Sequence, residues 1–400
     1  MNELPQISLQ QARLIMLNTL GLAYKARGRA RKEDLLKTIR YINFLQLDTI
    51  SVVARAHLHI LYSRLGAYQT KWLEELHAEG RLFEYFAHAM CFLPIEDFSL
   101  YWPDMLRRRE SDFFGGWALE RQEKLEAMLA AIRERGPMMS SDFKGERTGP
   151  WWGWKEEKGL LEALFYRGEL MIARREGFKR VYDLRERVLP NWQPSEGLSL
   201  EESVRLRYLQ AAKLLGVSTD TWLSKQTYLP NARTVVKELV AEKRLITASI
   251  KGFAKPIYVH PENLPVYERG LEGKLSAPST KILSMFDPLM VDRDRVKALF
   301  GFDYKIQVYV PKAQRDKGYY LLPILHQGKL VGRLDAKAFR KEGFLQVLAI
   351  HLEPGVKPSQ ALAKGLADEL KAYGSWMGLN TVKVELCIPQ ALKERLLKHL

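Results

Sequence analysis

The sequence has little cysteine and no long hydrophobic run, and both absences exclude broad classes of protein. Only two of its 400 residues are cysteines, Cys91 and Cys387, and they lie far apart in apolar segments. Two cysteines so placed exclude a disulfide framework and a cysteine-rich zinc or iron–sulfur site. No apolar stretch approaches the roughly 18 residues that a membrane helix needs. Segment 1–14 lacks the basic and apolar regions of a signal peptide, so we expect a cytoplasmic protein without membrane contact.

Familiar catalytic signatures are absent as well. The sequence contains no phosphate-binding P-loop, no dinucleotide-binding glycine motif after a strand and no nucleophile elbow. Among the eight histidines, only His57 and His59 lie close together, and no cysteine or carboxylate stands near them at ligand spacing. We therefore expect neither a metal nor another cofactor.

The sequence is rich in positive charge. It holds 62 lysine and arginine residues against 47 acidic residues, a net charge of +15. A soluble protein with this excess usually binds a polyanion, although a merely basic soluble protein is the alternative. The basic residues are spread along the chain, which favours a long binding groove over a single basic tail.

Helices and short strands alternate in repeated units, which predicts an α+β fold. Segment 126–190 has the order helix, helix, helix, hairpin, with the turn at Glu176-Gly177, and this order is typical of a winged helix. Segment 200–261 repeats the order and turns at Lys251-Gly252, whereas the first hundred residues fit it more loosely. Trp151, Trp152 and Trp154 belong either to the core or to a platform on which bases stack.

Four domains are predicted on this basis. They are a winged-helix-like module at 1–100, connector helices with a second winged helix at 101–190, a third winged helix at 191–275 and a β-rich domain flanked by helices at 276–400. Within the last domain, alternation over 305–325 predicts a long β-hairpin whose tip lies around 311–319.

An amide and a carboxylate interrupt the apolar stretch 42–57. In a strand, Gln46 and Asp48 would point to the same face, while Leu45 and Leu47 would anchor the other. Such a pair can hold one water, because the carboxylate attracts its proton and the amide fixes its orientation. The alternative is structural: Asp48 or Thr49 would cap a helix that begins near Ser51.

Three segments carry a resemblance to a known family. They are 44–68, "FLQLDTISVVARAHLHILYSRLGAY", the segment 284–325 that begins "SMFDPLMVDRDRVKALFGF", and the wing-bearing middle of the chain. Together they resemble the AlkZ/YcaQ family of bacterial winged-helix DNA glycosylases, and most of all its YcaQ (AlkX) branch. The family motif is Gln–apolar–Gln in one branch and Gln–apolar–Asp in the other; this chain has the second form. It departs from the family at Met285 and Val291, where proline and tryptophan are common.

The resemblance implies both an architecture and an activity. The architecture is three tandem winged helices that curve into a C-shaped, basic DNA channel. The activity is that of a monofunctional glycosylase on N7-alkylated purines, which in the YcaQ branch also unhooks interstrand crosslinks. Gln46 and Asp48 would be its catalytic residues, and no lysine nucleophile is required.

The expected partner is duplex DNA that carries alkylated or crosslinked purines, and no obligate protein partner is implied. When bound to DNA, the protein would be associated with the nucleoid. The hairpin around 311–319 is the candidate wedge that holds the duplex open. The residues that we expect to contact DNA are Arg55, Arg174, Arg175, Lys179, Arg180, Lys312, Arg315 and Lys317.

Two other functions fit the sequence. Three winged helices would also suit a regulator or architectural protein that binds duplex DNA without catalysis. However, no effector domain is evident, and the segment 154–164 carries three glutamates on the helix that would enter a groove. An enzyme that acts on structured RNA is the third possibility. Salt-dependent binding is common to all three, whereas release of a base from alkylated DNA separates them.

Overall fold

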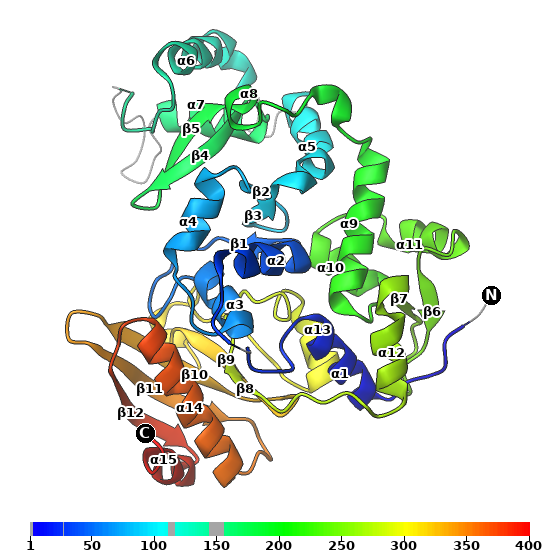
Figure 1. The fold of residues 1–400 in the computed structure, drawn as a ribbon, viewed down its shortest axis with the longest axis vertical. Coiled ribbons are helices and arrows are strands. Elements are labelled where there is room, and N and C mark those ends of the chain that lie inside the picture. Colours follow the sequence, from blue (N-terminus) through cyan, green and yellow to red (C-terminus); the bar gives the residue numbers. More distant parts are fainter. Residues whose placement is uncertain (1–2, 27, 111–116, 144–155) are drawn as a thin grey trace. The chain divides into compact units, whose positions relative to one another are not determined.

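The computed structural model describes residues 3–26, 28–110, 117–143 and 156–400 and contains both helices and strands (Figure 1). Contacts within the chain divide it into two compact units. Unit 1 comprises Met1–Gln69 and Tyr208–Leu400, and unit 2 comprises Thr70–Arg207. These bounds differ from the four domains expected from the sequence, because both ends of the chain contribute to unit 1.

Unit 1 contains most of the helices and a large sheet. Its first segment holds α1 (Leu9–Thr19), α2 (Lys32–Ile42), β1 (Leu45–Gln46) and α3 (Ala56–Leu65). Its second segment begins within α9 (Leu200–Leu215) and continues with α10 (Asp220–Thr227), α11 (Ala232–Ala241), β6 (Ile246–Ala248), β7 (Ile257–Val259), α12 (Leu264–Leu271), β8 (Thr280–Ile282) and α13 (Arg293–Phe300). The C-terminal elements are β9 (Leu321–His326), β10 (Lys329–Phe339), β11 (Phe344–Leu352), α14 (Gln360–Trp376), β12 (Thr381–Ile388) and α15 (Gln390–Leu397).

The C-terminal strands form a five-stranded sheet in the order β12-β11-β10-β9-β8. All neighbours are antiparallel except β11 and β12, which are parallel because α14 connects them. The turn between β9 and β10 has Gln327 and Gly328 at positive φ, as a two-residue hairpin requires. Helix α14 lies against the sheet and contacts β8, β12 and α15 (Figure 1). A sheet backed by helices was expected in this region.

The N-terminus is tied to a hairpin more than 200 residues away. The amides of Leu4 and Ile7 donate to the carbonyls of Thr247 and Ser249 at 2.9 and 3.0 Å. Tyr267 in α12 donates its hydroxyl to the Pro5 carbonyl at 2.6 Å. The first residues of the chain therefore extend the β6–β7 pair instead of belonging to a separate N-terminal module.

Unit 2 consists of helices and two hairpins. Its elements are α4 (Lys71–Ala78), β2 (Leu82–Phe86), β3 (Met90–Pro94), α5 (Phe98–Glu110), α6 (Gln122–Arg135), α7 (Glu156–Tyr166), β4 (Leu170–Glu176), β5 (Lys179–Leu184) and the short α8 (Arg185–Val188). The β4–β5 turn lies at Gly177 and Phe178, both at positive φ, one residue later than expected.

The predicted order of helices and hairpin is found in 200–261, but only part of 126–190 is described and can be compared with it. In 200–261 the helices α9, α10 and α11 precede the β6–β7 hairpin. In 126–190 the helices α6 and α7 precede β4 and β5, but no helix begins in 136–143, where the second one was expected, and Met138 instead bridges to Tyr182. The three tryptophans lie in 144–155, outside the described residues. Whether either segment forms a true winged helix stays a prediction.

Candidate active site

Gln46 and Asp48 follow the end of α2 in unit 1. Leu45 and Leu47 are 0% and 8% exposed, whereas Gln46 and Asp48 are half-buried, so the predicted alternation is present. The strand is shorter than expected, because β1 ends at Gln46 and Asp48 lies in the connection to α3. The two polar side chains thus stand where the chain leaves the core.

One backbone amide holds the Asp48 carboxylate. Its Oδ1 accepts a hydrogen bond from the Ile50 N–H at 2.7 Å, which closes a turn around Thr49. The helix-capping alternative is wrong, because α3 begins only at Ala56 and its N-cap residue is Arg55. Burial raises the pKa of the Asp48 carboxyl, and the bond from Ile50 opposes this shift.

Among the residues that the structure describes, the carboxylate of Asp48 has no cationic partner. In the part of the chain that the structure describes, no lysine or arginine forms an ion pair with it or lowers its pKa. This is unusual in a protein of net charge +15, in which Arg64, Arg175 and Arg207 each bind a buried carboxylate. An unneutralised, half-buried carboxylate is suited to attract a proton or to stabilise a positive charge.

The C-terminal sheet fixes the segment that follows Asp48. The amide of Ala338, near the end of β10, donates to the Val52 carbonyl at 3.0 Å. Arg340 donates to the carbonyl of Val53, and the hydroxyl of Tyr320 donates to that of Ala54 at 3.1 Å. The position of Asp48 therefore depends on residues almost 300 positions later in the chain.

Two tyrosines of the loop before β9, Tyr309 and Tyr320, feel the charge of Asp48. Burial, and then the charge of Asp48, raises the pKa of both Tyr309 and Tyr320, and Tyr319 adds to both shifts. Tyr320 is 1% exposed and Tyr309 is 69% exposed, so one supports the segment while the other faces solvent. The sequence interpretation missed these residues, although three tyrosines between 309 and 320 were an available signal.

The predicted hairpin around 311–319 is wrong. Residues 305–320 contain only a 3-10 turn at Lys312–Gln314, and the first strand after them is β9. Pro311 has no amide to donate to a strand partner, and Gly318 has a φ of +139°. The amides of Tyr319 and Tyr320 bind the side chain of Asp335 at 2.8 and 3.0 Å, instead of a neighbouring strand.

The basic residues of the β4–β5 hairpin differ in their surroundings. Arg175 binds Glu84 with two hydrogen bonds of 2.6 Å, and its side chain is 8% exposed. The guanidinium is thus committed to the interior of unit 2, which argues against the expected contact with DNA. Arg180 binds the buried Glu162 at 2.6 Å, which neutralises its charge. Arg174 and Lys179 are both exposed, and Arg174 is paired with Glu176 at 2.7 Å.

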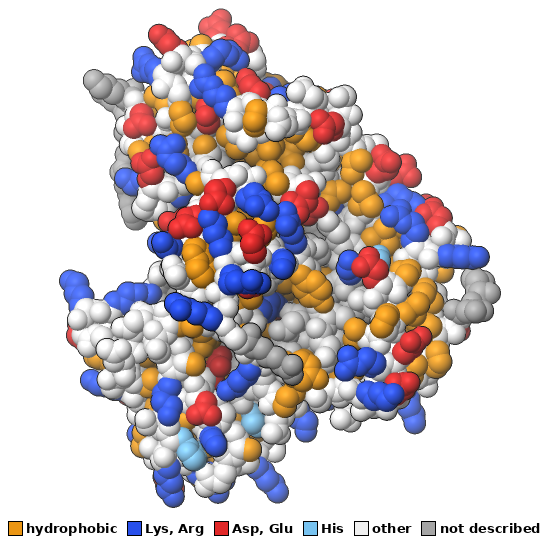
Figure 2. Space-filling view, in the orientation of Figure 1, with side chains coloured by type: hydrophobic (Ala, Val, Ile, Leu, Met, Phe, Trp, Pro, Cys, Tyr) orange, Lys and Arg blue, Asp and Glu red, His pale blue; other side chains and the backbone are white. Residues whose placement is uncertain are grey.

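The basic residues of unit 1 divide in a similar way. Lys312 and Lys317 are exposed on the loop, and Lys317 is 3.7 Å from Asp316. Arg315 has a structural role, because its Nε donates to the Val310 carbonyl at 2.9 Å and its guanidinium lies over the Tyr319 ring. Arg55 precedes α3 and is half-buried. On the face shown in Figure 2, lysine and arginine side chains of each unit are interspersed with acidic ones.

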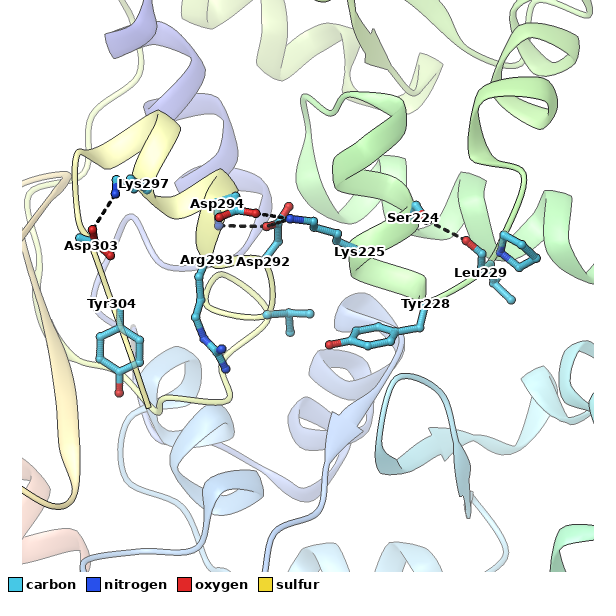
Figure 3. A pocket seen from close by; sticks show the side chains of 12 residues that line it. Ser224, Lys225, Tyr228, Leu229, Asp292, Arg293, Asp294, Lys297, Asp303 and Tyr304 are labelled. Atoms are coloured by element: carbon cyan, nitrogen blue, oxygen red, sulfur yellow. Dashed lines mark hydrogen bonds and ion pairs between the residues drawn. The ribbon is translucent and has the colours of Figure 1, made fainter. Parts of the chain in front are cut away.

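A cavity of about 800 Å³ lies elsewhere in unit 1, between the end of α10 and the start of α13 (Figure 3). Its cations Lys225 and Lys297 pair with Asp294 and Asp303. Figure 3 shows Arg293 extending away from both pairs, on the side where Tyr228 and Tyr304 lie. Because most of its charges neutralise one another, this cavity offers no carboxylate comparable to Asp48.

The described ranges contain neither a metal-binding cluster nor a membrane-spanning helix. No cluster of three or more His, Cys, Asp or Glu side chains with the geometry of a metal site occurs in residues 3–26, 28–110, 117–143 and 156–400. Over the same ranges, no helix has both the length and the apolar character needed to cross a membrane.

Comparisons with known proteins agree with one another. The sequence model of the family described as DNA glycosylase AlkZ-like matches residues 39–376, which include Gln46, Asp48 and the tyrosine-rich loop. Among solved structures, the fold is similar to that of the Streptomyces sahachiroi DNA glycosylase AlkZ, with a TM-score of 0.65. The similarity covers 95% of this chain and 100% of the other at 13% sequence identity, so it concerns the fold alone.

Proposed function

The chain belongs to the AlkZ-like DNA glycosylase family, and from this premise we propose that it hydrolyses the N-glycosidic bond of N7-alkylated purines in duplex DNA. The observation that carries the proposal is the Asp48 carboxylate, half-buried, bound by one amide and without a cationic partner among the described residues. A lysine or arginine beside the Asp48 carboxylate would repel a positively charged purine and would neutralise the carboxylate.

The reaction needs little acid catalysis. An N7-alkylpurine carries a positive charge, and the electron pair of the C1′–N9 bond neutralises it when the base departs. The sugar is left as an oxocarbenium ion, as in other glycosidic cleavages. Asp48 stabilises this cation and accepts the proton of the water that attacks C1′. Gln46 orients the same water through its amide.

We further propose that the site accepts interstrand crosslinks. A base that is tied to the opposite strand cannot rotate freely into a closed pocket, as the substrates of many glycosylases do. A site that lies at the surface suits this lesion better than a deep one. The 69% exposure of Tyr309, close to Asp48, supports an open site.

The test is single-turnover release of N7-methylguanine from methylated duplex DNA, followed by unhooking of a duplex with one N7-linked crosslink. We expect release from both substrates by the wild-type protein. Tight binding of both duplexes without release from either would leave a DNA-binding protein without catalysis. Release from the methylated duplex alone would retain the glycosylase and remove the crosslink proposal.

A further inference from the structure

Tyr309 carries an exposed aromatic ring on the loop that is hydrogen-bonded, through Tyr320, to the segment that follows Asp48. Its side chain is 69% exposed, more than that of any other large apolar or aromatic residue within the described ranges. The charge of Asp48 reaches its hydroxyl and contributes to its raised pKa. No hydrogen bond or ring contact of this side chain accounts for its position among the described residues.

The loop holds Tyr309 in place through the residues on both sides. The Val310 amide donates to the Gln307 carbonyl at 3.0 Å, and the Val310 carbonyl accepts from Arg315 Nε at 2.9 Å. The side chain of Gln307 accepts from the Asp316 amide at 3.2 Å. The backbone on either side of Tyr309 is thus fixed by the loop itself, while the ring between these contacts stays open to solvent.

The same loop is joined to the segment that carries Asp48. Tyr320 donates to the Ala54 carbonyl at 3.1 Å, and Asp335 binds the amides that precede β9. The pairing of β10 with β11 shifts register between Asp335 and Ala336, where Leu348 of β11 is left without a partner. These contacts hold the exposed ring and the carboxylate on one framework.

We propose that Tyr309 determines the specificity of this site for a positively charged base, by laying its ring against the N7-alkylpurine while Asp48 faces the sugar. This inference rests on the proposed function. A cation is attracted to the face of an aromatic ring, and any base gains by stacking on one. The two contributions together favour an alkylated purine over the same purine without its charge.

The test uses Tyr309→Leu, Tyr309→Phe and the control Tyr24→Leu. Tyr24 is also an exposed tyrosine of unit 1, and its hydroxyl contacts Ser276 at 3.0 Å. We expect Tyr309→Leu to slow release of N7-methylguanine roughly 5- to 30-fold, the loss of a cation–π contact of about 1–2 kcal/mol. Tyr309→Phe keeps the ring and should restore most of this loss. Thermal unfolding midpoints should not change, because the side chain is exposed.

A binding measurement separates this inference from the proposed function. Calorimetry would compare the 7,9-dimethylguaninium cation with neutral 9-methylguanine, each added to the protein bound to a duplex with an abasic site. The wild type should prefer the cation, and Tyr309→Leu should reduce that preference even if no base release were ever observed, while the part due to Asp48 remains. Equal preference in wild type and Tyr309→Leu, equal losses in the Leu and Phe variants, or a similar loss in Tyr24→Leu would each overturn the inference.

Discussion

Replacing Asp48 by asparagine or by alanine separates chemistry from local structure. The Asp48 side chain accepts one hydrogen bond, from the Ile50 amide at 2.7 Å, and asparagine can accept the same bond through its carbonyl oxygen. Alanine cannot, and it should lower the free energy of unfolding by about 0.5–1.5 kcal/mol. Asparagine should leave stability unchanged or raise it slightly, because it removes a charge that burial disfavours.

Both variants should lose base release. Removing one preorganised electrostatic group from an active site costs roughly 10²–10³ in rate. The assay is single-turnover release of N7-methylguanine, run beside thermal unfolding and fluorescence anisotropy of duplex binding. Affinity for DNA should persist, since a carboxylate adds nothing to the attraction of phosphates. The reasoning would be refuted by an asparagine variant that retains most of the wild-type rate, or by one that loses folding and DNA binding together.

Three further predictions concern pH, the loop and DNA affinity. Burial raises the pKa of Asp48 above its ordinary 3.8, and the ionised form is the active one. The rate of base release should therefore be full above the shifted pKa and should begin to fall at a higher pH than for an ordinary aspartate. A pH–rate profile that is flat down to pH 4 would contradict this. Gly318→Ala adds a Cβ that would overlap a buried carboxylate, so it should slow release, whereas Gly355→Ala, also at positive φ but in open space, should not. Lys312→Ala with Lys317→Ala should weaken duplex binding and reduce its logarithmic salt slope by about 2 in a salt titration.

The candidate site could be proposed from the sequence, but its surroundings could not. Gln46 and Asp48 drew attention because two polar residues interrupt an apolar run, which is a local signal, and the family resemblance favoured a catalytic role over helix capping. The tyrosines were missed because they approach Asp48 only after the chain has folded over more than 250 residues. Alternation over 305–310 resembles a strand, but the Asp335 side chain takes the amides of Tyr319 and Tyr320 that a hairpin would have paired.

The positive charge of a side chain was a poor guide to its exposure, because its acidic partner can lie far away in the sequence. Arg175 was assigned to DNA from its place in a basic run, yet its partner Glu84 lies 91 positions earlier in the chain. The contact units also differ from the four expected domains, because Leu4 and Ile7 bond to residues of the β6–β7 hairpin. Helix and hairpin order over 200–261 depends on local periodicity and turn residues, and it was predicted correctly.

The distribution of ion pairs bears on the kind of substrate that this site selects. Arg64 binds Asp287 with two hydrogen bonds of 2.7 and 3.1 Å, and Arg175 binds Glu84 in the same manner, so buried carboxylates in both units receive guanidinium partners. Among the residues described, Asp48 has instead one amide as its partner, and its charge acts on Tyr309 and Tyr320. Such an environment keeps a negative charge without supplying its counterion, and this is costly unless a cation arrives with the substrate. A purine that is positively charged before the bond breaks, and a sugar that becomes positively charged as it breaks, both meet that requirement.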